Sequence, residues 1–359
     1  MSLKKFIFVG VLSLMLLILL APNSSAQGAM TNILFSPYNW YVTNSSAETI
    51  NSGAYFRTLV GGSKTCGIGL IIGTATPYSQ CWARFDSGNW QEYVPTTSGA
   101  QTWSLTLPNG TTTNKHLLEF VIKSTTETQD RWNNQTTSLT FTGITLDAGG
   151  ALTLPTARRY CVLIYGDSIT EGVRVNGFEG IPNDTDRNDV LSDYSYNLGP
   201  LLDAEIGVVG FGATGLSRGG SGNVPPLPQS YNQLWKGQPR DFSPVPDLVI
   251  YNEGTNDGND STTPQMVEVI KGIGYRGKAN THAGLNGTRH LVLEPFAGSQ
   301  KENLQAAVKS IGSSNVVYGS TEGFWSRSDA SDGLHPYGYA HLNSLAPLVS
   351  TLALPLLRP

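Results

Sequence analysis

Two patterns of apolar and polar residues divide the chain. Over residues 27–150, apolar and polar side chains alternate in short runs such as 54–60, 102–107 and 116–122. Alternation with a period of two is typical of strands that bury one face. Turn residues rich in Gly, Pro and Asn separate these runs, and no stretch has a convincing helical period. This half of the chain therefore predicts a β-sandwich of jelly-roll type.

After about residue 153 the pattern changes, because continuous apolar runs now alternate with helical patterns. Buried strands are expected at residues 161–165, 206–209, 248–251, 290–294 and 315–318. Helices are expected at residues 189–204, 263–275, 299–311 and 337–354. Strands that alternate with helices indicate parallel βαβ units. We therefore predict an α/β domain of three layers, flavodoxin-like, around a five-stranded parallel sheet.

The first 26 residues have the plan of a secretory signal peptide. Two lysines precede an apolar run over residues 6–20, and the small residues Ser24 and Ala26 precede Gln27. This run is shorter than the roughly 20 apolar residues that span a bilayer. We expect cleavage before Gln27, a secreted protein (extracellular or periplasmic) and no membrane attachment after cleavage.

The change of pattern predicts two domains after this leader, an accessory β-sandwich over 27–152 and a catalytic domain over 153–359. The chain has 23 basic and 27 acidic residues and no basic run, which argues against a nucleic-acid partner. Three cysteines are present. We expect a Cys66–Cys81 disulfide in the sandwich and a buried thiol at Cys161, since a free cysteine in a central strand behaves as a small core residue.

The candidate chemistry lies at the ends of the predicted parallel strands. Ser168 follows the first strand and begins a predicted helix, at the edge where open α/β sheets bind ligands. Gly212 follows the second strand, and a glycine lets the backbone N–H approach a ligand closely. Asn256 follows the third strand and offers a neutral side-chain donor. Late in the chain, Asp332 and His335 are three residues apart and can pair on one side of a turn.

Together and in this order, the four blocks resemble the SGNH (GDSL-like) hydrolase superfamily. The resemblance implies that Ser168 is the nucleophile, His335 the general base and Asp332 the residue that orients it. It also implies an oxyanion hole made of the Ser168 N–H, the Gly212 N–H and the Asn256 side chain. The first block reads Gly-Asp-Ser-Ile instead of Gly-Asp-Ser-Leu. The histidines and cysteines have no zinc-ligand spacing, and we predict no metal and no cofactor.

A sandwich followed by an SGNH domain is similar to carbohydrate esterase family 2, whose members deacetylate plant polysaccharides. The resemblance implies a secreted serine esterase that hydrolyses short O-acyl esters, acetyl above all, on a carbohydrate or a small ester substrate. A lipase or arylesterase of the same superfamily and a non-catalytic carbohydrate-binding protein are the alternatives. Substrate contacts are predicted at Asp167, Trp325 and Tyr337, with Phe178 as a further stacking face.

Two other stretches compete for a functional role. Ser217 lies in a Gly-x-Ser-x-Gly pattern, the nucleophile elbow of other hydrolases, but glycines and prolines follow where that elbow needs a helix. We interpret this stretch as a loop beside the site. The carboxylates of residues 183–189 could hold calcium, but they lack the Gly and the late Glu of a calcium loop, and Asp189 is well placed as a helix cap.

Overall fold

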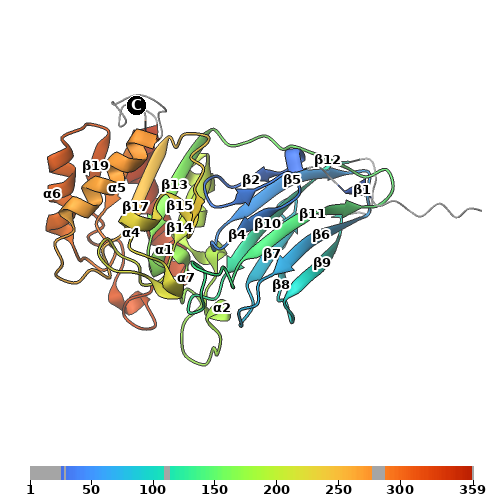
Figure 1. Cartoon of the computed structure of the whole chain (residues 1–359), viewed down its shortest axis with the longest axis horizontal. Coiled ribbons are helices and arrows are strands. Elements are labelled where there is room, and N and C mark those ends of the chain that lie inside the picture. Colours follow the sequence, from blue (N-terminus) through green and yellow to red (C-terminus); the bar gives the residue numbers. More distant parts are fainter. Residues whose placement is uncertain (1–25, 28–29, 109–113, 277–287, 358–359) are drawn as a thin grey trace, which may run out of the picture.

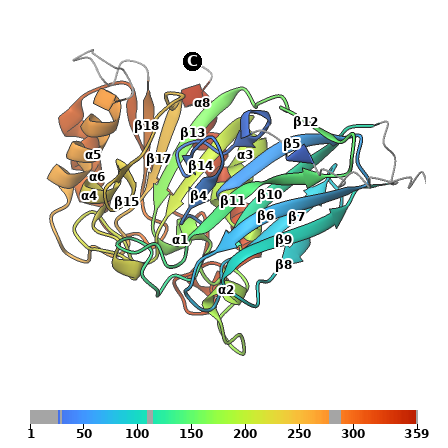
Figure 2. The same cartoon turned by 45° about the vertical axis from the view of Figure 1, so that its right-hand side comes forward.

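The computed structural model describes residues 26–27, 30–108, 114–276 and 288–357. An all-β part and an α/β part lie side by side along the long axis of the molecule (Figure 1). The same arrangement is seen after a turn of 45° (Figure 2). Residues 1–25, most of the predicted signal peptide, lie outside the described residues.

The all-β part consists of two antiparallel sheets. One has the strand order β3-β4-β11-β6-β9, and β1 also pairs with β11. Its strands are β1 (Ala26–Gln27), β3 (Tyr41–Val42), β4 (Ala47–Thr49), β6 (Thr65–Ile72), β9 (Gly99–Thr106) and β11 (Leu139–Leu146). The other has the order β12-β5-β10-β7-β8, with β2 paired to β5. Its strands are β2 (Leu34–Phe35), β5 (Tyr55–Gly61), β7 (Gln80–Phe85), β8 (Gln91–Tyr93), β10 (His116–Ser124) and β12 (Ala151–Thr153).

One apolar core joins these two sheets. Phe56 of β5 stacks on Phe120 of β10 at 4.7 Å between ring centroids, and lies 4.4 Å from Phe141 of β11 in the other sheet. Such aromatic contacts add to the free energy gained by burying apolar area. The three strands expected from alternation are confirmed as β5, β9 and β10. The jelly-roll type and the domain boundary at residue 152 stay predictions.

The cysteines differ from expectation. Cys66 of β6 and Cys81 of β7 are free thiols, each fully buried in the core but in different sheets, so the expected disulfide is wrong. Burial disfavours the thiolate and raises the pKa of Cys66 to about 12. Cys161 is half-buried instead of buried, because it lies near the amino end of its strand, where its backbone N–H donates to the carboxylate of the exposed Asp247.

The α/β part is built on a five-stranded sheet of the order β14-β13-β17-β18-β19. All four pairings are parallel. The strands are β13 (Tyr160–Gly166), β14 (Ala204–Gly210), β17 (Leu248–Asn252), β18 (Arg289–Leu293) and β19 (Val316–Gly319). Every residue of β14 and β17 is buried, which explains their continuous apolar runs. The predicted five-stranded parallel sheet is therefore confirmed.

Helices cover both faces of this sheet. The longer ones are α3 (Tyr194–Leu202), α5 (Thr263–Arg276), α6 (Lys301–Ile311) and α8 (Ala346–Leu357). Leu163 and Tyr165 of β13 share an apolar cluster with residues of α5 and α6. Val162 and Ile164, which alternate with them, share another cluster with residues of α3 and α8. Successive residues of β13 thus face opposite helical layers.

Short elements complete the α/β part. They are α1 (Ser168–Glu171), α2 (Asp184–Arg187), η3 (Val190–Ser192), η4 (Ser221–Asn223), α4 (Leu227–Ser230), β15 (Gln233–Trp235), β16 (Gln238–Pro239), η5 (Arg327–Asp329), α7 (Gly338–Ala340) and the π-helical η6 (His341–Leu345). In the all-β part, η1 (Met30–Asn32) precedes β2.

The helix expected at residues 189–204 is shorter and interrupted. Asp189 caps η3 by accepting the Leu191 N–H at 2.9 Å, and Asp193 then caps α3 by accepting the Ser195 N–H at 2.7 Å. Each aspartate starts a new helix, so the chain cannot form one continuous helix. Ala204 already belongs to β14.

The last helical run, Gly338–Leu357, is long and apolar enough to cross a membrane by length and composition alone. Its residues Leu345, Val349 and Ala353 are fully buried in the cluster that covers one face of the sheet. Packing against the sheet accounts for the apolar character of these positions.

Candidate active site

Ser168 lies at the turn between β13 and α1. The side chain of Asp167 caps this one-turn helix by accepting the Ile169 N–H at 2.9 Å. Gly166 allows the turn, since a Cβ there would lie 1.9 Å from the Thr170 hydroxyl. The serine therefore stands at the carboxyl end of the central strand, at the N-terminus of a helix, as the sequence predicts.

The structure brings Ser168, His335 and Asp332 together. His335 Nε2 lies 2.9 Å from Ser168 Oγ, and His335 Nδ1 lies 2.6 Å from Asp332 Oδ2. The other oxygen of Asp332 accepts the backbone N–H groups of Leu334 and His335 at 2.9 and 2.8 Å. The carboxylate thus fixes both the turn and the imidazole ring. This is the geometry of a nucleophile, a base and an orienting acid.

Arg174 adds a contact that the sequence analysis missed. Its Nη1 donates to Asp332 Oδ2 at 2.5 Å, although 158 residues separate the two in the chain. Partial burial alone would raise the pKa of Asp332. The hydrogen bonds from His335 and Arg174 outweigh burial and hold this pKa well below its usual range. The lowered pKa favours the ionised form of Asp332.

Gly212 and Asn256 follow strands β14 and β17 at the same edge of the sheet. The Gly212 N–H donates to Glu171 Oε2 at 2.6 Å, and Asn256 Nδ2 donates to the Thr214 carbonyl at 2.8 Å. An amide nitrogen carries two hydrogens, so Asn256 keeps a second one for a ligand. Gly212 has a single N–H, which Glu171 already accepts. Their service as oxyanion donors, with the Ser168 N–H, stays a prediction.

Aromatic side chains of this half have diverse surroundings. Trp325 is half-buried and donates its Nε1–H to the Phe296 carbonyl at 2.9 Å. Tyr337 stacks on Tyr339 with ring centroids 5.8 Å apart. Phe178 is 39% exposed, and the guanidinium carbons of two arginines, Arg174 and Arg187, lie 4.4 and 4.3 Å from its ring centroid. Sugar stacking on Trp325, Tyr337 and Phe178 stays a prediction.

Asp167 is fully buried, and its capping bond gives it a structural task. Burial raises its pKa to about 6, although hydrogen bonds and the nearby His335 lower it. Glu253, just after β17, is also buried; burial, then the charges of Asp167 and Asp257, raises its pKa well above the ordinary value. The contact of Asp167 with substrate stays a prediction. The buried carboxyl group of Glu253 was not predicted from the sequence.

The competing stretches have other partners. Ser217 Oγ lies 2.6 Å from Asp257 Oδ1 and 2.6 Å from Asp260 Oδ2, and its single hydrogen can be donated to either one. Two carboxylates, not a histidine, therefore surround this hydroxyl. In the range 183–189, Asp184 accepts the Thr126 hydroxyl and the Glu127 N–H, and Asp189 caps η3. Within the described parts of the chain, no group of three His, Cys, Asp or Glu side chains could hold a metal ion.

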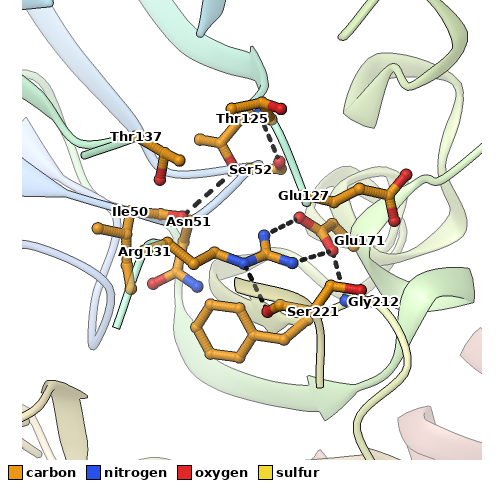
Figure 3. Close-up of polar contacts among 12 residues, drawn as sticks. Ile50, Asn51, Ser52, Thr125, Glu127, Arg131, Thr137, Glu171, Gly212 and Ser221 are labelled. Atoms are coloured by element: carbon orange, nitrogen blue, oxygen red, sulfur yellow. Dashed lines mark hydrogen bonds and ion pairs between the residues drawn. The ribbon is translucent and has the colours of Figure 1, made fainter. Parts of the chain in front are cut away.

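Two residues of the all-β part also reach this edge of the sheet. Figure 3 shows Glu127 and Arg131 next to Glu171 and Gly212. Arg131 donates to both carboxylate oxygens of Glu171, and both side chains are fully buried. Neither residue was predicted from the sequence. Glu171 lies inside the first block, but nothing local indicates that its partner comes from 40 residues upstream.

No family model and no curated protein matches the sequence. Solved structures match its fold. A family two carbohydrate esterase from Cellvibrio japonicus has a TM-score of 0.76 at 20% identity and covers 93% of this chain and 98% of its own. An acetyl xylan esterase from the rumen bacterium Butyrivibrio proteoclasticus has a TM-score of 0.71 at 16% identity, with 92% and 98% covered.

A family two carbohydrate esterase from Clostridium thermocellum, in complex with cellohexaose, has a TM-score of 0.69 at 17% identity, with 89% of this chain and 98% of that chain covered. At these identities the likeness establishes the fold. The structural neighbours are family 2 carbohydrate esterases and GDSL-like proteins, and the predicted resemblance is confirmed at that level.

Proposed function

We propose that this chain is a secreted serine esterase that removes short O-acyl groups, acetyl above all, from a carbohydrate. The observation that carries the proposal is the unbroken line of two hydrogen bonds from Ser168 through His335 to Asp332. The chemical class also agrees with the structural neighbours, which are carbohydrate esterases. The cellohexaose bound to one of them supports a glycan as the carrier of the ester.

In this mechanism neutral His335 takes the proton from Ser168 Oγ as the oxygen attacks the ester carbonyl. Asp332 keeps the imidazole hydrogen on Nδ1 and stabilises the imidazolium that forms. His335 then returns the proton to the leaving sugar oxygen, which leaves an acyl group on Ser168. Water, deprotonated by the same histidine, releases the acid and restores the enzyme.

Charge that develops on the carbonyl oxygen needs donors at the start of α1 and at the neighbouring strand ends. We propose the Ser168 N–H, the Asn256 amide and the Gly212 N–H for this role. The last of these has to be shared with Glu171, which accepts it at 2.6 Å. Removal of one such donor typically lowers kcat by about 10²–10³.

The nucleophile is tested with the variants Ser168→Ala and Ser217→Ala, assayed on p-nitrophenyl acetate and on acetylated xylan. We expect Ser168→Ala to lose hydrolysis while its melting temperature is kept, and Ser217→Ala to keep most of the activity. A fully active Ser168→Ala enzyme would refute the proposal. An inactive Ser217→Ala enzyme that folds normally would move the nucleophile to the other serine.

The lipase alternative is tested with esters of rising acyl length. The segments after the catalytic strands are polar and rich in glycine, which suits hydrogen bonds to sugar hydroxyls better than an apolar acyl tunnel. We therefore propose that acetyl esters exceed octanoyl esters by about tenfold or more in kcat/KM, since a closed pocket rejects extra methylenes. A preference for octanoyl esters would favour the lipase. Binding of xylan without any hydrolysis would favour the carbohydrate-binding alternative.

A further inference from the structure

The loop between β10 and β11 of the all-β part reaches the catalytic edge of the parallel sheet. Arg131 of this loop is fully buried there and donates to both carboxylate oxygens of Glu171, with Nη2 3.2 Å from Oε2. Its guanidinium carbon lies 5.0 Å from the centroid of the Phe211 ring, and its Nε donates to the Ser221 carbonyl at 3.3 Å. Figure 3 shows the dashed contacts of Arg131 with Glu171 and Ser221.

These contacts hold the backbone on both sides of Gly212. Glu171 Oε2 accepts the Gly212 N–H at 2.6 Å, and the Ser221 N–H donates to the Gly212 carbonyl at 2.7 Å. Both partners of Gly212, Glu171 and Ser221, are bound in turn by Arg131. Arg131 is therefore the common anchor of the segment that follows β14.

The same carboxylate ties this segment to the nucleophile. Glu171 is the last residue of α1, the single-turn helix that begins with Ser168. A shift of Glu171 would thus move the serine and the Gly212 segment relative to each other. Misplacement by about 1 Å in such a site can lower the rate about 10²-fold.

Charge gives a second reason for an arginine at this position. A fully buried carboxylate without a partner is costly, and beside a developing oxyanion it would also oppose the reaction. The bidentate guanidinium of Arg131 compensates this charge. An ion-paired carboxylate also competes less strongly with an oxyanion for the Gly212 N–H.

We propose that Arg131 is a positioning residue of the esterase site, which acts through Glu171 and the Gly212 backbone. The all-β part would then be needed for the rate of the chemical step as well as for any contact with the glycan. This inference rests on the proposed esterase function.

The test compares Arg131→Met and Arg131→Lys with a matched control, Arg57→Met. Arg57 of β5 pairs with Glu205 of β14, so it also joins the two parts by an ion pair, and the side chains are only 10% and 4% exposed. Glu205 lies near the amino end of β14, whereas Gly212 follows the carboxyl end. Loss of either pair removes a buried ionic contact, but only one pair lies at the catalytic edge.

We expect Arg131→Met to lower kcat on p-nitrophenyl acetate at least about tenfold with KM changed less than about twofold. Arg131→Lys should recover part of the loss, because it restores the charge but not the bidentate geometry. Arg57→Met should have a lower melting temperature than the wild type and an unchanged kcat. Hydrogen exchange of the peptide that contains Gly212 should be faster in Arg131→Met than in Arg57→Met.

Unchanged kcat in Arg131→Met, or an equal fall in kcat in Arg57→Met, would overturn the inference. If Arg131→Met fails to fold, kcat and hydrogen exchange of Arg131→Lys are compared with those of Arg57→Met instead. If the wild type hydrolyses no ester, the esterase proposal fails by itself. Hydrogen exchange then still decides whether Arg131 holds the Gly212 segment, and equal exchange in both variants rejects it.

Discussion

The Asp332 carboxylate accepts hydrogen bonds from several groups of the site at once. It accepts from His335 Nδ1, from two backbone N–H groups and from Arg174. An asparagine would keep an acceptor for the backbone but could present an N–H to the imidazole and favour the wrong tautomer. We expect Asp332→Asn to lower kcat by about 10²–10⁴ with normal folding, as measured by steady-state kinetics and circular dichroism.

Arg174→Gln is the informative companion of that variant. It removes one donor to Asp332 but leaves the His335 contact in place, so its loss of kcat should be the smaller one. Equal losses of kcat in the two variants would mean that the main role of Asp332 is to bind the Arg174 guanidinium, and not to orient the imidazole of His335.

Buried Asp167 makes the stability of the protein depend on pH. Burial raises its pKa to about 6 from an ordinary value of 3.8, so the folded state disfavours the charged form. Relative to Asp167→Asn, which keeps the capping oxygen, the wild type should be stable below about pH 4 and lose stability as the pH rises to about 6. Above about pH 6, the free energy of unfolding of the wild type should have fallen by about 3 kcal/mol at most relative to the variant.

Urea unfolding of both proteins at pH 4 and pH 7.5 measures this effect. The difference between the two free energies of unfolding isolates Asp167, because the other titrating groups are shared. A difference that is the same at both pH values would contradict the raised pKa.

The turn from β13 into α1 depends on tight contacts between elements. A Cβ at Gly166 would lie 1.9 Å from Thr170 Oγ1 in the same turn. Gly166→Ala should therefore displace α1 or the strand and cost about 1–3 kcal/mol or more. Gly61→Ala in β5 is the control, since its Cβ would lie 3.2 Å from the flexible Lys115 side chain and 4.0 Å, an ordinary contact distance, from the Asn114 carbonyl oxygen.

Thermal unfolding of the two variants tests that expectation. A marked fall in melting temperature is expected for Gly166→Ala and little change for Gly61→Ala. If both variants melt like the wild type, the turn has more freedom than its contacts indicate.

Strands and helices could be predicted where the pattern that specifies them lies within a short stretch of sequence. The five parallel strands show as apolar runs. Ser168, Asp332 and His335 were found from their place at strand ends and turns together with the resemblance to the SGNH superfamily. The helix expected at 189–204 failed because the caps at Asp189 and Asp193 outweigh an apolar pattern. Arg174 and Arg131 could not be predicted, since each meets a partner far away in the sequence and neither belongs to a motif.

At the scale of the whole molecule, the two parts share buried charges. Glu205 of β14 accepts the Tyr55 hydroxyl at 2.5 Å and pairs with Arg57, and Glu171 pairs with Arg131. Deletion of residues 27–150 would leave both carboxylates without these partners and expose the surface that faces the all-β part. We expect the truncated chain to be insoluble or unfolded and to lack activity even on p-nitrophenyl acetate.

Size-exclusion chromatography and circular dichroism of the truncated chain check this expectation. A folded, soluble fragment with wild-type turnover of p-nitrophenyl acetate would show that the α/β part is independent. A truncated chain that regains structure when Glu171 and Glu205 are both changed to Gln would trace the failure to the unpaired charges.

The ion pair between Arg131 and Glu171 also bears on how such a two-part protein could be rebuilt. Protein engineers often exchange accessory domains to direct a catalyst to a new polysaccharide. Here the exchange would remove, together with the all-β part, the counter-charge of Glu171, which ends the short helix that begins with Ser168. A chimaera would need either a donor scaffold with an arginine in the same loop or a neutral residue at Glu171, so the two halves of this chain have to be redesigned as one unit.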